Sequence, residues 1–112
     1  MTFDPDQLEA RLMSHGVYVT SLETDDERIE VEYESIKAGQ AGVVPHREVG
    51  RVINVVRELT EVERNLRGSV TDLDGKQIGR WHAESEWLRA LENDELSEVD
   101  FSQRVIESID DS

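Results

Sequence analysis

The sequence predicts an α+β fold in which an antiparallel sheet of four strands carries its helices on one face. Two segments alternate apolar and polar residues around short turns, which is typical of half-buried β-hairpins. Between them, apolar residues recur at helical spacing over residues 49–59. The predicted order is therefore helix, hairpin, helix, hairpin, helix. A length of 112 residues suits one domain, residues 1–112, with a tail at 110–112 that we expect to fray.

The first helix is expected to begin after Asp4, which suits the N-cap, with Pro5 at the first helical position. Phe3 and Leu8 hold the positions of a hydrophobic staple around that cap. Gly16 is expected to end the helix as a left-handed residue.

The first hairpin is expected between residues 17 and 36. Its second strand alternates three apolar residues with three glutamates: Ile29, Val31 and Tyr33 against Glu30, Glu32 and Glu34. With the tip at residues 25–26, Leu22 would lie opposite Ile29 and Tyr18 opposite Tyr33. This register gives one apolar face and one acidic face.

A glycine-rich linker is expected at residues 37–42, and residues 41–44 could add a fifth strand. The long helix follows, with Pro45 in its first turn. Its apolar positions are Val49, Val52, Ile53, Val56 and Leu59. We expect this helix to cover the apolar face of the sheet.

The second hairpin is expected to turn at residues 74–75, an Asp-Gly pair. The implied pairs are Val70 with Gly79, Gly68 with Trp81, and Leu66 with Ala83. The opposite, wet face would carry Arg67, Ser69, Thr71, Lys76, Ile78, Arg80 and His82. Small residues thus face large ones on the buried side.

Two short helices are expected at the C-terminal end. Ser85 is expected to cap the first, which should end near Asn93. An acidic loop at residues 92–98 follows. Asp100, with Gln103 three residues on, is expected to open the second.

The net charge is the strongest compositional feature. Twenty-six acidic residues oppose twelve basic ones, for a formal charge of −14, and only two of the twelve are lysines. Such a charge pushes a compact chain apart, and salt near 1 M screens the repulsion because the Debye length falls to ~3 Å. This acid-rich, Lys-poor composition resembles that of proteins from salt-accumulating haloarchaea. The alternative is an ordinary acidic protein that the charge keeps soluble.

Several classes of function are disfavoured by composition. The chain has no cysteine, and no apolar run reaches the ~18 residues of a membrane span. Met1 leads straight into Thr-Phe-Asp-Pro, so we expect no secretory signal and a cytoplasmic location. The acidic balance makes nucleic acid and anionic lipid improbable partners.

Arg67, Arg80 and His82 form one candidate binding cluster on the wet face of the second hairpin. Positive charge gathered there could hold a phosphate or a carboxylate. The alternative is that the three glutamates of the first hairpin pair with them across the sheet.

Arg47 and Arg51 form a second candidate on the outward face of the long helix. They could contact an acidic partner or nucleic acid, or they could simply be solvated. His15, His46 and His82 fall on different elements in no metal-binding spacing. We therefore expect no metal and no cofactor.

No catalytic motif is present: there is no G-x-S-x-G and no phosphate-binding glycine loop. With a third strand at residues 41–44, the element order resembles that of type III secretion chaperones, which have a helix, three strands, a helix, two strands and a helix. That resemblance implies a dimer that holds partner proteins. The favoured function is a non-catalytic protein-interaction or accessory module, with a protein partner or a second copy. The alternative is a binder of small anionic molecules, or a minor enzyme, with a pocket between sheet and helices near Trp81.

Overall fold

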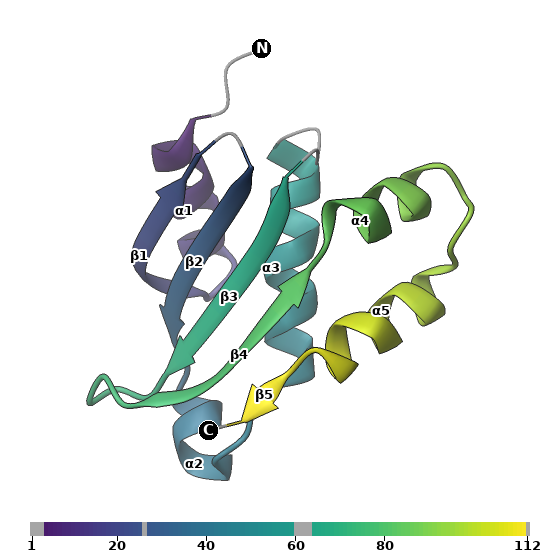
Figure 1. Cartoon of the computed structure of the whole chain (residues 1–112). Coiled ribbons are helices and arrows are strands. Elements are labelled where there is room, and N and C mark those ends of the chain that lie inside the picture. The colour runs from purple at the N-terminus through teal and green to yellow at the C-terminus, as the bar shows by residue number, and fades with distance from the viewer. Residues whose placement is uncertain (1–3, 26, 60–63, 112) are drawn as a thin grey trace.

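The computed structural model describes residues 4–25, 27–59 and 64–111 and shows an α+β fold (Figure 1). Four long strands and a two-residue fifth strand form one sheet in the order β1-β2-β3-β4-β5. The elements are α1 (Pro5–Ser14), β1 (Tyr18–Thr24), β2 (Arg28–Glu34), α2 (Ile36–Ala41), α3 (His46–Leu59), β3 (Asn65–Thr71), β4 (Gln77–Ala83), α4 (Ser85–Glu92), α5 (Glu98–Glu107) and β5 (Asp110–Asp111).

The sheet is mixed, so the prediction of an antiparallel sheet is wrong. Both hairpins are antiparallel, but β2 and β3 run parallel, from Arg28 beside Asn65 to Glu34 beside Thr71. The reason is the connection. Helices α2 and α3 carry the chain back before it enters β3, which is how parallel neighbours are joined. Alternation predicts each hairpin but not the direction in which two hairpins meet.

The simple order of helix, hairpin, helix, hairpin, helix is also wrong, because α2 and β5 are additional. Helix α2 replaces most of the expected linker. Ser35 caps it by accepting a hydrogen bond from the backbone N–H of Ala38 at 3.0 Å, and Gly42 ends it with a φ of 72°. Residues 41–44 form no strand, so the third strand that the chaperone-like order needs does not occur there.

The start of the chain follows the prediction where the structure describes it. The carboxylate of Asp4 accepts from the backbone N–H of Asp6 at 3.0 Å, and Gly16 has a φ of 84°. Phe3, the other half of the expected staple, lies outside the described residues. Leu8 and Leu12 of α1 are buried.

The register of the first hairpin differs from the prediction. Leu22 lies opposite Val31, and Tyr18 lies opposite Glu34. The carboxylate of Asp25 accepts from the backbone N–H groups of Glu27 and Arg28 at 2.7 and 2.9 Å, which makes a longer turn than two residues. Residue 26, half of the expected tip, lies outside the described residues.

A β-bulge at Thr20 reduces this shift from two residues to one, and it moves Tyr18 to the exposed side. Tyr18 is 53% exposed to solvent. The prediction that Tyr18 belongs to the apolar face is therefore wrong. The predicted faces of β2 are confirmed, since Ile29, Val31 and Tyr33 are buried.

The second hairpin has the predicted register, with Leu66 opposite Ala83, Gly68 opposite Trp81 and Val70 opposite Gly79. Thr71 and Ile78 are buried, although both were expected on the wet face. A register shift between Val70 and Thr71 interrupts the alternation there. The carbonyl of Thr71 also accepts from the N–H of Ser35 at 2.9 Å, which brings the start of α2 over the strand end.

The C-terminal segments begin and end differently from the prediction. Helix α5 starts at Glu98, because the Ser97 hydroxyl accepts from the N–H of Asp100 at 3.1 Å and so caps the helix earlier. Ser85 is the first residue of α4, and Glu84 is its N-cap. Asp110 and Asp111, part of the expected tail, pair with Arg80 and Gly79 as β5, and residue 112 lies outside the described residues.

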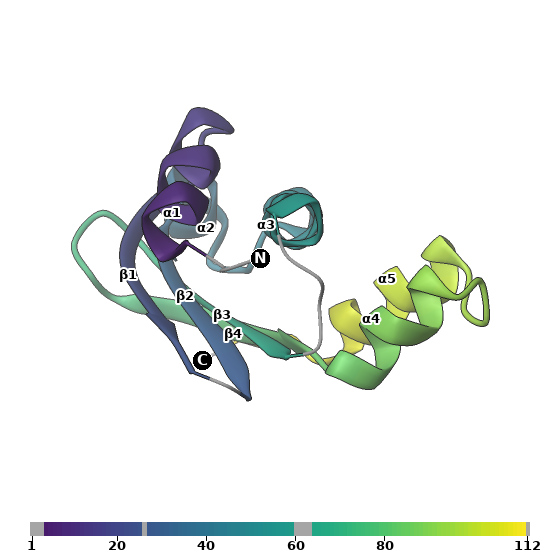
Figure 2. The same cartoon turned by 90° about the horizontal axis from the view of Figure 1, so that it is seen from above.

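The helices cover one face of the sheet only in part. Figure 2 shows α1 and α3 above one face, while α4 and α5 lie beyond the β4 edge. Five α3 residues are buried: Val49, Val52, Ile53, Val55 and Val56. The face opposite α3 carries no helix, and it presents the polar residues of all four long strands.

Candidate functional site

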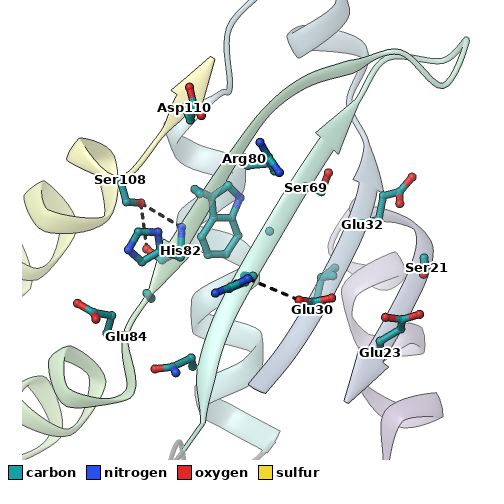
Figure 3. A pocket seen from close by; sticks show the side chains of 16 residues that line it. Ser21, Glu23, Glu30, Glu32, Ser69, Arg80, His82, Glu84, Ser108 and Asp110 are labelled. Atoms are coloured by element: carbon teal, nitrogen blue, oxygen red, sulfur yellow. Dashed lines mark hydrogen bonds and ion pairs between the residues drawn. The ribbon is translucent and has the colours of Figure 1, made fainter. Parts of the chain in front are cut away.

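The uncovered face of the sheet is hollowed into a groove of about 700 Å³, which we call the open-face groove (Figure 3). Its lining is Ser21, Glu23, Glu30, Val31, Glu32, Asn65, Arg67, Gly68, Ser69, Arg80, Trp81, His82, Ala83, Glu84, Ser108 and Asp110. The groove thus contains Arg67, Arg80 and His82, which the sequence placed on one face.

Arg67 is paired within this groove. Parallel pairing places Arg67 beside Glu30, and the guanidinium lies 3.9 Å from the carboxylate. Arg28 lies 3.5 Å from the same carboxylate. This agrees with the interpretation that the glutamates of β2 balance the cations of the second hairpin. Arg80 forms no ion pair with any described residue.

His82 connects β4 to the C-terminal helices. Its backbone N–H donates to the Ser108 hydroxyl at 3.0 Å (Figure 3). That hydroxyl has two acceptors for its proton, the carbonyl of Val105 at 2.5 Å and the carbonyl of His82 at 3.0 Å. The imidazole stacks on Trp87 with 5.6 Å between ring centroids. The guanidinium of Arg104 lies 6.0 Å from the Trp87 ring centroid. His82 therefore has a structural role in attaching α4 and α5.

The charge of the open-face groove does not favour an anion. Its lining has two arginines against five carboxylates, those of Glu23, Glu30, Glu32, Glu84 and Asp110. Trp81 contributes little to the surface, since only 2% of it is exposed. The pocket near Trp81 thus lies on the uncovered face, while the sequence predicted one between sheet and helices.

Arg47 and Arg51 lie elsewhere, in a second groove of about 570 Å³ at the N-terminal end of α3, which we call the end groove. Its lining is Gly16, Tyr18, Glu34, Ser35, Ile36, Lys37, Val43, Val44, Pro45, His46, Arg47, Glu48 and Arg51. The two candidate clusters of the sequence are therefore separate sites.

Three exposed apolar side chains line the end groove: Tyr18, Ile36 and Val43, each about half exposed at 53%, 53% and 49%. None of these three residues was predicted from the sequence to line a binding site. Tyr18 was assigned to the buried face through the wrong register, and the other two flank a segment that was expected to be a linker. A possible signal was the presence of two large apolar residues at the ends of a polar, glycine-rich stretch.

The end groove is also positively charged. Lys37, Arg47 and Arg51 face two carboxylates, and one of these, Glu48, accepts a hydrogen bond from the Ser35 hydroxyl at 3.0 Å. A guanidinium N–H of Arg51 donates to the His15 carbonyl at 3.5 Å. Within the described residues none of the three cations forms an ion pair.

Two displaced pKa values have structural causes. Hydrogen bonds from the backbone of Glu27 and Arg28 lower the pKa of Asp25, in the turn of the first hairpin. Burial raises the pKa of Tyr33, in the core. Neither residue lines a groove. Among the residues that the structure describes, no three His, Asp or Glu side chains are grouped to hold a metal ion.

The comparisons with known proteins identify a family without naming an activity. None of the helices in the described residues has the length and apolar character needed to cross a bilayer. Neither the curated proteins nor the solved structures contain a significant match. One family model matches residues 2–112, which is nearly the whole chain, and its description is Domain of unknown function (DUF8159). The chain therefore belongs to the DUF8159 family.

Proposed function

We propose that this protein is a non-catalytic interaction module of a salt-rich cytoplasm, and that its end groove binds an acidic polypeptide segment carrying apolar side chains. One observation supports this most directly. In a chain with a charge of −14, the end groove combines three exposed apolar side chains with three cations that form no ion pair with any described residue.

The apolar part of the argument concerns Tyr18, Ile36 and Val43. Single exposed apolar residues are normal, but a contiguous group rimmed by polar residues is typical of a contact surface. These three come from β1, α2 and the loop before α3, so the fold gathers them from separate segments. Tyrosine at such a surface offers a large contact area with few rotatable bonds.

The electrostatic part concerns Lys37, Arg47 and Arg51. The end groove has a net charge of +1 from three cations and two carboxylates, while the whole chain has −14. An acidic segment is attracted to this end and repelled from the rest of the surface, which fixes where it binds. High salt weakens this attraction and strengthens the apolar contacts.

A polypeptide fits this surface better than a nucleic acid. A duplex carries one charge per ~1.7 Å and needs many cations, and the acidic remainder of the chain would repel it. A polypeptide can match three cations with a few carboxylates and place aliphatic or aromatic side chains on the apolar residues.

The test uses a random copolymer of glutamate and tyrosine as the probe, with polyglutamate for comparison. Binding to the intact chain is measured by fluorescence anisotropy at about 1 M KCl, where charges are screened beyond ~3 Å but close contacts persist. We expect the Glu/Tyr copolymer to bind and polyglutamate to bind at least about tenfold more weakly, because only the former supplies apolar contacts.

Two double variants form a matched pair. Arg47→Glu with Arg51→Glu reverses two cations of the end groove, whereas Lys76→Glu with Arg80→Glu reverses two exposed cations of the second hairpin. Both pairs change the net charge equally. We expect only the first to abolish binding. Equal losses in both variants would show that overall charge governs binding, and loss only in the second would favour the alternative, an anion site around Arg67, Arg80 and His82.

A further inference from the structure

A narrow cleft of about 190 Å³ lies between α3 and the C-terminal helices. Five buried apolar residues line it: Val49 and Ile53 on α3, and Leu91, Phe101 and Val105 on α4 and α5. The rest of the lining is more exposed and mostly polar, formed by His46, Gly50, Asn54, Arg57, Glu98, Ser102 and Ile106. Figure 2 shows α3 above the sheet and the pair α4 and α5 beside it, and an ion pair at 2.8 Å between Arg57 of α3 and Glu92 of α4 joins the two sides.

Gly50 lies in the middle of α3 and lines this cleft. Glycine inside a helix destabilises it relative to alanine, because it loses more conformational freedom on folding. Close packing of a neighbour does not explain this glycine, since a Cβ at position 50 would have no atom within 4 Å. Gly50 therefore places no side chain in the cleft that it lines.

The cleft adjoins the end groove. His46, at the first position of α3, lines both. A chain segment bound along the end groove therefore reaches the mouth of the cleft without leaving the surface.

We propose that the α3–α5 cleft holds an aromatic side chain of the acidic polypeptide that binds in the end groove; this inference rests on the proposed function. The size agrees, because an apolar cavity of about 150 Å³ accommodates one benzene ring. The arrangement also agrees with the anatomy of protein interfaces, in which a few buried side chains, often aromatic and seated in pockets, supply most of the affinity. The end groove then supplies charge and position, and the cleft beside Gly50 supplies the anchor.

The first experiment tests the cleft without any polypeptide. The ¹H–¹⁵N NMR spectrum of the full chain is titrated with 4-methylphenol, the side-chain analogue of tyrosine. We expect saturable shifts at the amides of Gly50 and of its cleft neighbours. Gly50→Leu, which places a leucine side chain in the cleft, should weaken binding at least about tenfold. Gln103→Leu adds an exposed leucine on α5 outside the cleft and should retain binding as the control.

The second experiment repeats the copolymer measurement with the same variants. We expect Gly50→Leu to weaken binding of the Glu/Tyr copolymer and to leave the weak binding of polyglutamate unchanged. Gln103→Leu, outside the cleft and the end groove, should bind both probes as the unaltered chain does.

The outcomes separate the two proposals. No saturable shift at the cleft, or equal affinity in Gly50→Leu, overturns the aromatic anchor while the end groove can still bind. If 4-methylphenol binds the cleft but the copolymer binds nowhere, the proposed function fails, and the cleft is a site for a free aromatic molecule instead of an anchor.

Discussion

The indole N–H of Trp81 donates a hydrogen bond to the phenol oxygen of Tyr33 at 3.1 Å, across the intervening strand β3. Gly68 of β3 makes this possible. A Cβ at position 68 would lie 2.1 Å from the indole ring of Trp81, so only glycine lets the ring lie across the strand. Both aromatic residues are buried, and their polar atoms satisfy each other in the core.

Replacing Gly68 should therefore destabilise the fold sharply. In Gly68→Ala the new methyl group displaces the Trp81 ring, and we expect a loss of about 1–3 kcal/mol in the free energy of unfolding. Urea unfolding followed by tryptophan fluorescence measures this. Gly50→Ala is the matched control, because its methyl group meets open space in a helix and should instead stabilise the chain by about 0.5–1 kcal/mol. A neutral Gly68→Ala would contradict the packing described for Trp81.

Tyr33 should make the fold sensitive to alkali. Its pKa in the folded chain is raised by burial, so the neutral phenol is the form that folding favours. The contribution is complete below the ordinary pKa of tyrosine, near 10, and is lost as the pH rises above it toward the folded value. We expect the unfolding midpoint in urea to fall above about pH 10 in the unaltered chain.

Tyr33→Phe is the control for that alkaline effect. It should be less stable at neutral pH by about 1–3 kcal/mol, because the Trp81 N–H loses its acceptor in the core. It should also lose most of the decline above pH 10. An unchanged alkaline profile in Tyr33→Phe would assign the effect to other groups.

Ser108 should control the attachment of the C-terminal helices. Its hydroxyl binds the backbone of His82 through both the N–H and the carbonyl. In Ser108→Ala we expect faster amide hydrogen exchange at His82 and a loss of about 0.5–1.5 kcal/mol, one ordinary hydrogen bond. Ser102→Ala is the comparison, since Ser102 is exposed on the same helix. Equal exchange rates in both variants would show that the Ser108 hydroxyl does not protect the His82 amide.

Salt should stabilise the fold, and the contact between Glu23 and Glu30 should show this effect. Glu23 lies opposite Glu30 in adjacent strands, and like charges in that position are destabilising. We expect the melting temperature to rise with KCl up to molar concentrations. Glu23→Gln should stabilise the chain by a few tenths of a kcal/mol at low salt and have no effect near 3 M KCl. A melting temperature that is independent of KCl would favour the ordinary acidic protein.

Local patterns predicted the parts of the fold that depend on neighbouring residues. The helical repeat of residues 49–59 defined α3, and the Asp-Gly turn fixed the register of the second hairpin. The acidic turn of the first hairpin gave no comparable constraint. The Asp25 carboxylate accepts hydrogen bonds from two backbone N–H groups. These bonds lengthen the turn and shift the register of the two strands.

The candidate site was less predictable, because it depends on how separate segments meet. Arg47 and Arg51 were identified by their helical spacing. Their apolar neighbours were not, because Tyr18 is exposed only through the bulge at Thr20, and Ile36 only through the start of α2. The role of Gly50 was not predictable from the sequence, because a glycine inside a helix can be interpreted only when the space beside it is known.

The parallel seam between β2 and β3 has a consequence for how the chain can be divided. Each hairpin can form from its own residues, but the seam joins two halves whose partners lie 37 positions apart, from Arg28 to Asn65. A chain cut at Gly42, in the connection between β2 and β3, would give two pieces. In each piece, one of these two strands would lack its neighbour and present an unpaired edge. Neither piece should form the native sheet alone. Association of the two pieces would show that β2 and β3 have paired.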